Sequence, residues 1–164
     1  MINVALFGFG RIGQMHAENL CKNKEIKLLY VCEKTNELNK KAKNLYDCKI
    51  EKDYNKIFKD KTVDIIFISS PTNTHIKFIE EGIKTKKTIF CEKPLDLDIN
   101  KIINTLKKVK KFKPKIQLGF NRRYDPGHHS IKKELYKNKI GKLEKIIITS
   151  RDPAPPSISY LKSS

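Results

Sequence analysis

Short apolar runs alternate along the chain with longer segments in which apolar residues recur every three or four positions. The short runs predict strands at 2–7, 26–32, 63–68, 88–91 and 115–120, with a less regular one at 48–50. The periodic segments predict helices at 12–24, 35–45, 54–58, 76–83 and 99–109. Apart from Asp64, the run at 63–68 is apolar on both faces, which is typical of a strand buried in a parallel sheet. Strands that alternate with helices predict a doubly wound α/β fold with a parallel sheet.

The pattern changes after residue 120. A turn-rich polar stretch is followed by a helical pattern around Ile131 and by a predicted strand at 146–149. One helix and one strand bury too little apolar surface to form a domain. We therefore expect one domain at 1–120 and the truncated start of a second, α+β domain at 121–164. Two alternatives stay open for this last part: it adds to the first sheet, or the natural protein continues past it.

The charge balance raises the question of nucleic acid, because 35 Lys and Arg stand against 18 Asp and Glu, which gives a formal net charge of +17. Only 4 of the basic residues are Arg, and the lysines are spread over nearly every polar face. Recognition of phosphates and bases favours the bidentate Arg side chain. We therefore expect no specific nucleic-acid partner, only weak and salt-sensitive attraction to polyanions.

The four cysteines show no C-x-x-C spacing, so neither a disulfide framework nor a zinc site is indicated, and no other metal site is expected. Cys32 and Cys91 close apolar runs and are interpreted as small buried hydrophobic residues. The chain enters its first strand at residue 2, without the features of a signal peptide, and no apolar run approaches membrane-spanning length. These features favour a cytoplasmic protein without a membrane partner.

The first predicted strand leads into a glycine-rich turn and then a helix, with the sequence Gly8-Phe9-Gly10-Arg11-Ile12-Gly13. In a dinucleotide site of this kind the first glycine permits the tight turn, the second leaves room for the pyrophosphate, and the third lets the helix pack on the strand. The alternative is a glycine turn that binds no nucleotide. Arg11 argues against that alternative, because a cation in the first turn of a helix opposes the macrodipole unless an anion lies nearby.

Glu33 follows Gly13 by twenty positions and comes at the end of the second predicted strand. A carboxylate at this place accepts hydrogen bonds from the hydroxyls of an adenosine ribose and repels a 2′-phosphate. The cofactor expected is therefore NAD, with NADP less favoured. The neighbouring Lys34 weakens that preference.

Polar loops follow two further strands, with the sequences Ser69-Ser70-Pro71-Thr72-Asn73-Thr74-His75 and Glu92-Lys93-Pro94. Because ligands bind beyond the carboxyl ends of parallel strands, both loops are expected beside the glycine turn. Two structural alternatives stay open. The polar residues at 72–74 cap the next helix, or the charges of Glu92 and Lys93 form an ordinary salt-bridged turn. The functional alternative places the Lys93 ammonium next to a nicotinamide ring.

With these motifs in view, the chain resembles the amino-terminal half of the Gfo/Idh/MocA family of nicotinamide-dependent oxidoreductases, which have a Rossmann NAD-binding domain. The glycine turn, Glu33, the segment 71–75 and above all Glu92-Lys93-Pro94 carry the resemblance. The segments 119–126 and 150–156 are most similar to those of inositol 2-dehydrogenases.

The resemblance implies that a secondary alcohol of a cyclic polyol, with myo-inositol as the example, gives hydride to C4 of the nicotinamide. Lys93 would be the catalytic residue, placed beside the reacting hydroxyl, and Lys93, Arg122 and Asp152 would bind the substrate, with Arg123 as a substitute for Arg122. The implied cofactor-binding residues are Gly8, Phe9, Gly10, Arg11, Ile12, Gly13, Glu33, Ser70, Pro71, Thr72, Asn73, His75, Glu92 and Lys93. His75 is expected to be a hydrogen-bonding neighbour of the cofactor without a role in proton transfer.

The resemblance also implies an Asp and a His on a helix of the second domain, beyond residue 164, and a homo-oligomer for the full-length protein. We therefore expect a fragment that binds NAD and turns over little or no substrate. Two alternatives are a non-catalytic dinucleotide-binding protein or subunit, and a dehydrogenase of the same family for another sugar or polyol. The helix that follows His75 ends in Thr85-Lys86-Lys87 where the family has a glycine, which predicts a strained or rearranged end.

Overall fold

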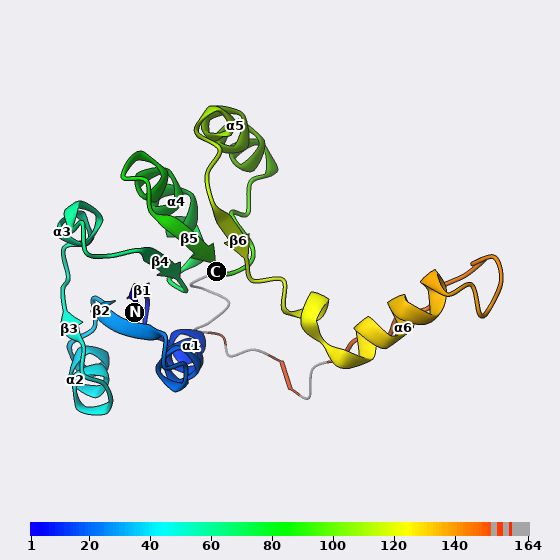
Figure 1. Cartoon of the computed structure of the whole chain (residues 1–164), viewed down its shortest axis with the longest axis horizontal. Helices are drawn as coiled ribbons and strands as arrows, with labels where there is room; N and C mark the ends of the chain where they lie inside the picture. The colour runs from blue at the N-terminus through cyan, green and yellow to red at the C-terminus, as the bar shows by residue number, and fades with distance from the viewer. Residues whose placement is uncertain (152–153, 156–157, 159–164) are drawn as a thin grey trace. The chain divides into compact units, whose positions relative to one another are not determined.

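Six parallel strands form one sheet in the order β3-β2-β1-β4-β5-β6 in the computed structural model, which describes residues 1–151, 154–155 and 158 (Figure 1). The strands are β1 Ile2–Phe7, β2 Ile26–Cys32, β3 Lys49–Ile50, β4 Ile65–Ile68, β5 Thr88–Cys91 and β6 Ile116–Leu118. The chain runs outward from β1 to β3 and then returns to pair β4 with the other side of β1. The strand order therefore reverses between β1 and β4, where doubly wound sheets bind ligands.

Helices cover both faces of this sheet (Figure 1). The helices are α1 Arg11–Lys22, α2 Asn36–Leu45, α3 Tyr54–Lys59, α4 His75–Lys84 and α5 Ile99–Val109. One buried cluster joins α1 and α2 to the sheet through Ala17 and Ala42, and the other joins α3, α4 and α5 through Phe58, Ile79 and Val109. The predicted doubly wound α/β fold is confirmed.

Strand β1 supplies both clusters because successive side chains of a strand point to opposite faces. Leu6 packs with the α1–α2 cluster, whereas Ala5 and Phe7 pack with the other one. The Phe7 ring meets Phe58 and Phe78 edge to face, with centroids 5.3 and 4.9 Å apart. This aromatic contact anchors the strand that carries the glycine turn.

At the end of α4, a lysine in a left-handed conformation occupies the position where glycine was expected. Lys86 has φ +57°, its N–H bonds the Ile83 carbonyl at 3.0 Å, and the Lys87 N–H bonds the Gly82 carbonyl at 2.8 Å. These two bonds are those of a Schellman motif, in which glycine is the usual residue at this position. A side chain at a positive φ is strained, so this helix end holds an unfavourable residue.

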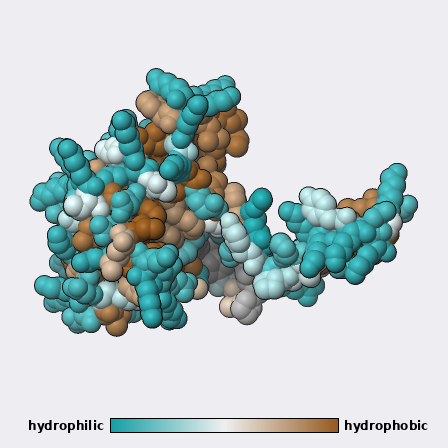
Figure 2. All heavy atoms as spheres, in the orientation of Figure 1, coloured by the Kyte–Doolittle hydropathy of each residue, from teal (hydrophilic) through white to brown (hydrophobic). Residues whose placement is uncertain are grey.

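Exposed apolar side chains gather over α5, where Figure 2 shows them at the surface among hydrophilic neighbours. Ile99, Ile103 and Leu106 are all exposed, although Val109 at the end of the same helix is buried. None of the described helices is both long enough and apolar enough to cross a membrane. Among the described residues, no group of three or more His, Cys, Asp or Glu side chains is placed to hold a metal ion.

The chain divides into two units, Met1–Gly119 and Phe120–Ser164. In the second unit, the short 3₁₀ helix η3 Asn121–Tyr124 leads into α6 Pro126–Tyr136, whose N-terminus is capped by the Asp125 side chain. The strand predicted at 146–149 is wrong: these described residues form no strand. Ile147 and Ile148 are 77 and 74% exposed, and no described residue after Leu118 joins the sheet. β-Branched residues favour a strand only where a neighbouring strand accepts their hydrogen bonds.

Candidate functional site

The glycine turn after β1 is packed at two of its glycines and open at the third. Gly8 has φ +90°, and a Cβ on it would lie 2.6 Å from the backbone of Ser70. A Cβ on Gly13 would lie 2.1 Å from the Gly8 carbonyl oxygen. A Cβ on Gly10 would meet no atom within 4 Å. The turn and the helix therefore need Gly8 and Gly13 for packing, whereas Gly10 keeps a surface clear in front of the helix.

Helix α1 begins directly at this clear surface. Gly10 is its N-cap residue, no side chain caps the helix, and its first turn contains no acidic residue. The first N–H groups of a helix have no partner within the helix, so an uncapped start attracts an anion. Arg11 and Ile12 are the next two residues, and Arg11 is exposed. The residues present thus fit the pyrophosphate of a dinucleotide.

Glu33 lies against the glycine turn. Its Oε2 accepts the Phe9 N–H at 2.8 Å, and its Oε1 accepts the Lys34 and Thr35 N–H groups at 2.7 and 3.0 Å. Burial by itself would raise the pKa of this carboxyl, but the bonds from Phe9, Thr35 and Lys34 together hold it below its ordinary value. Glu33 is therefore an anion fixed beside the turn, with its two oxygens held by backbone N–H groups.

The loop after β4 touches the glycine turn from the other side. The Ser69 hydroxyl donates to the Gly8 carbonyl at 2.9 Å, and its N–H donates to the Phe7 carbonyl at 2.8 Å. The 3₁₀ helix η1 Thr72–Thr74 follows, and the hydroxyls of Ser70 and Thr74 are 2.6 Å apart.

The predicted capping of α4 by this loop is not observed. Thr74 is the N-cap residue, but its side chain makes no capping bond and its hydroxyl bonds the Pro71 carbonyl at 2.7 Å. Pro71 and Asn73 are exposed and Thr72 is half-buried. The loop thus presents these three residues beside the turn without using them to cap the helix.

His75 is buried and holds two loops together. The residue is 1% exposed, with Nδ1 2.7 Å from the Pro94 carbonyl oxygen and Nε2 2.8 Å from the Ser70 carbonyl oxygen. Both ring nitrogens therefore face protein carbonyl groups. This placement links the loop after β4 to the loop after β5 and leaves neither nitrogen turned toward a ligand.

The loop after β5 carries Glu92-Lys93-Pro94, and its charges do not pair with each other. The Glu92 Oε1 lies 2.8 Å from His16 Nε2, and Oε2 accepts the Lys93 N–H at 3.2 Å. Among the described residues, the exposed Lys93 side chain takes part in no ion pair. The salt-bridged turn considered from the sequence is therefore not formed, and the ammonium group is available at the surface.

His16 is the residue of this site that sequence reasoning missed. It lies three positions after Gly13 in α1, so both residues point to the same face of the helix, toward the sheet. That spacing is a signal for a side chain near the strand ends. Its partner Glu92, however, is 76 positions away.

The remaining predicted residues belong to the second unit. Arg122 lies in η3, is exposed, and has a guanidinium nitrogen 3.9 Å from an Asp125 carboxylate oxygen. Arg123 is also exposed in η3. Asp152 lies outside the described residues.

Comparison with known proteins agrees with this geometry. The model of an oxidoreductase family with an NAD-binding Rossmann fold, GFO_IDH_MocA, matches residues 2–120. The inositol 2-dehydrogenase of Rhizobium meliloti is 36% identical over 163 residues, and the myo-inositol 2-dehydrogenase of Thermotoga maritima is 36% identical over 165 residues. Each of these comparisons covers 99% of this chain and 49% of the relative, so the chain spans about half the length of the curated relatives it matches.

Solved structures give the same result. A myo-inositol dehydrogenase from Corynebacterium glutamicum superposes with a TM-score of 0.90 at 34% identity, over 98% of this chain and 48% of that one. A scyllo-inositol dehydrogenase from Lactobacillus casei, with bound NAD(H) and scyllo-inositol, superposes with a TM-score of 0.79 at 31% identity, over 86% of this chain and 42% of that one.

Proposed function

The chain belongs to the Gfo/Idh/MocA family of oxidoreductases, whose model describes an NAD-binding Rossmann fold, and we propose that it is the nucleotide-binding part of an NAD-dependent polyol dehydrogenase. The observation that carries this proposal is the meeting of three loops at one edge of the sheet. Ser69 bonds the glycine turn, His75 bonds the loop of Pro94, and His16 of α1 bonds Glu92. One extended ligand that touches all three loops suits this arrangement.

In this proposal the first residues of α1 bind the pyrophosphate of NAD. Gly10 leaves space for it, and the free N–H groups with Arg11 supply positive charge. Glu33 accepts hydrogen bonds from the adenosine ribose, and its negative charge disfavours NADP. Phe9 donates its backbone N–H to the Glu33 carboxylate and so holds that side chain in place.

The other half of NAD lies along the two later loops. Ser70, Pro71, Thr72 and Asn73 border the nicotinamide side, and Glu92 contacts its ribose. We assign His75 a part in shaping these loops, because both of its nitrogens face protein carbonyls. NAD, when bound, supplies the acceptor for hydride.

Lys93 acts at the reacting hydroxyl of the substrate. Its exposed ammonium orients the alcohol and eases the loss of the hydroxyl proton through local positive charge. Arg122 and Asp152 are proposed to bond further hydroxyls. An inositol is the proposed substrate, with myo-inositol oxidised at C2 to a ketone as the first to test, because the relatives at 36% identity are inositol dehydrogenases. The proposed full-length protein is a homo-oligomer that supplies an Asp and a His as proton-handling partners of Lys93.

Isothermal titration with NAD and NADP tests the cofactor part of this proposal. We expect NAD to bind the 164-residue chain more tightly than NADP, and Glu33→Ser to reduce that preference. The matched control is Glu37→Ser, because Glu37 is an exposed carboxylate in the first turn of α2. Absence of NAD binding by the natural chain would contradict the proposal.

Turnover tests the catalytic part. With NAD and myo-inositol, the 164-residue chain should produce little or no reduced cofactor, and robust turnover would show that the second-domain Asp and His are not needed. NAD binding without turnover also fits a non-catalytic dinucleotide-binding subunit. The gene sequence downstream of codon 164 separates the two, since the dehydrogenase requires an open frame that encodes the Asp and His.

A further inference from the structure

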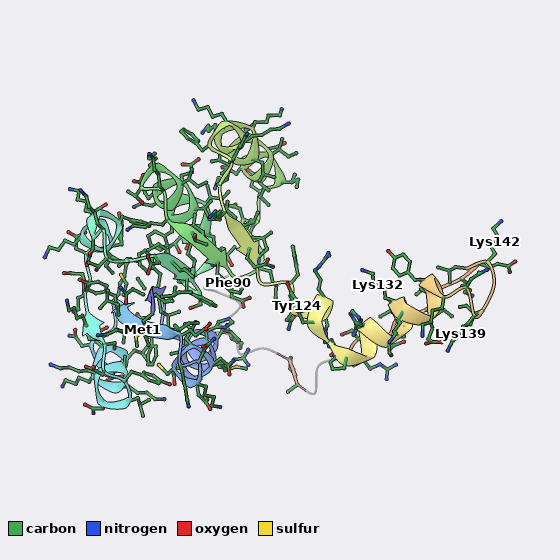
Figure 3. The ribbon with its side chains drawn as sticks, in the orientation of Figure 1. Met1, Phe90, Tyr124, Lys132, Lys139 and Lys142 are labelled. Atoms are coloured by element: carbon green, nitrogen blue, oxygen red, sulfur yellow. The ribbon has the colours of Figure 1, made fainter. Side chains whose placement is uncertain are left out.

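His16 is held by packing on the face of the sheet that α1 covers. Its ring centroid is 4.6 Å from that of Phe67 and 5.4 Å from that of Phe90, which lies on β5 (Figure 3). Phe67 and Phe90 are opposite each other in β4 and β5, and their rings stack with centroids 4.0 Å apart. Two rings from adjacent strands therefore fix the plane of the imidazole.

The fixed ring makes one polar contact with the loop after β5. His16 Nε2 is 2.8 Å from Glu92 Oε1, and the two side chains are 22 and 19% exposed. Because a carboxylate oxygen only accepts, Nε2 is the donor. A bond to a carboxylate is shorter and stronger than one between neutral groups, so it restrains the Glu92 side chain.

The Glu92 carboxylate is confined from two further directions. The Lys93 N–H donates to Oε2 at 3.2 Å. Gly119, which directly follows β6, faces the same group: a Cβ there would lie 3.0 Å from Glu92 Cδ and Oε1. Each carboxylate oxygen has two acceptor sites, so each one keeps capacity for another donor after these bonds. The orientation of the carboxylate is thus set before any ligand arrives.

We infer that His16 is a positioning residue, which holds the Glu92 carboxylate in the orientation that accepts hydrogen bonds from the nicotinamide ribose. This inference rests on the proposed function, in which Glu92 contacts that ribose. His16 touches neither cofactor nor substrate and acts through Glu92. It contributes to the affinity for the nicotinamide half of NAD and leaves the affinity for the adenosine half unchanged.

The variant that tests this inference is His16→Phe, which keeps a ring on Phe67 and Phe90 and removes the N–H donor. We measure affinities for NAD, ADP-ribose and ADP by isothermal titration with the 164-residue chain. ADP-ribose contains the second ribose and ADP lacks it. His16→Phe should weaken the affinities for NAD and ADP-ribose about tenfold, as expected for one hydrogen bond to a charged group. The affinity for ADP should change by less than about twofold. His16→Gln, which restores an N–H donor, should recover part of the loss.

A cycle with Glu92→Ala shows whether His16 acts through Glu92. In the Glu92→Ala background, His16→Phe should have no further effect on NAD affinity. Gly119→Ala would crowd the same carboxylate and leave the His16 side chain unchanged, because its Cβ would lie 3.0 Å from Glu92 Cδ and Oε1. It should therefore reproduce the loss for NAD and ADP-ribose even where His16→Phe folds poorly.

The outcomes are distinct. Equal losses for ADP and NAD in His16→Phe would mean that the ring only supports the fold, and this result would overturn the inference. An unchanged NAD affinity, or additive effects of His16→Phe and Glu92→Ala, would overturn it as well. If the natural chain binds NAD and ADP-ribose no more tightly than ADP, the proposed function itself fails, and the inference fails with it.

Discussion

Replacing Lys86 by glycine should stabilise the chain, although it removes a side chain and adds flexibility. Lys86 has φ +57° at the end of α4, where its N–H and that of Lys87 close the helix. A residue with a Cβ pays roughly 1–2 kcal/mol in the left-handed region. Glycine escapes that strain but loses more conformational freedom on folding, by about 0.4–1 kcal/mol. The net gain in the free energy of unfolding is therefore about 1 kcal/mol.

Urea unfolding followed by far-ultraviolet circular dichroism measures this gain, and thermal unfolding should show a rise in Tm of about 3 °C. Lys84→Gly is the matched control, because Lys84 lies in the last turn of the same helix. There glycine should cost about 1 kcal/mol relative to a good helix former. If Lys86→Gly destabilises the chain as much as Lys84→Gly does, the left-handed end of α4 and the reasoning built on it are wrong.

Three further predictions test the site and the core. Gly13→Ala should lower the free energy of unfolding in urea by about 3 kcal/mol, since its Cβ would lie 2.1 Å from a backbone oxygen. Gly10→Ala, whose Cβ would meet no atom within 4 Å, should lower it by less than about 1 kcal/mol and yet weaken NAD binding. Glu33 has a pKa lower in the folded chain than its unfolded value of about 4.3. It therefore stabilises the fold above that pH and loses this effect as pH falls through the folded pKa, so Glu33→Gln should flatten the acid limb of a stability profile between pH 3 and 6. Burial, with the nearby Glu92 charge, raises the pKa of Cys91 to about 12, so iodoacetamide at pH 8 should label the exposed Cys21 and spare Cys91 until the chain is unfolded, as mass spectrometry would show.

The sequence predicted the sheet well because its signal is local. The run Ile26–Cys32 forms β2 with those bounds. The helix that begins at Ile99 is capped by the Asp98 side chain, and Asp is a residue type favoured at that position. Glu33 lies beside the glycine turn because a βαβ unit fixes the distance between the ends of its two strands. Composition and spacing therefore predict a contact when the two residues are close in the chain or belong to consecutive strands.

Other features depend on partners that a single segment does not reveal. The contact between His16 and Glu92 joins residues 76 positions apart, and the sequence pattern marks both residues without pairing them. The segment 146–149 has strand-forming residues, but the described part of the chain offers it no neighbouring strand. Lys86 adopts a conformation that its residue type disfavours, because the helix and the following strand determine the path of the backbone there.

The order of the strands along the chain determines when the proposed nucleotide site is completed during synthesis. A chain leaves the ribosome from its N-terminus, so Gly8 and Glu33 emerge well before Ser70, on whose backbone Gly8 packs. Glu92 emerges later still, although its partner His16 is already present. A nascent chain can therefore display the whole glycine motif and still have no completed site. A dinucleotide that binds across all three loops would stabilise only chains whose sheet has closed through β5, and would thus select for completed folding.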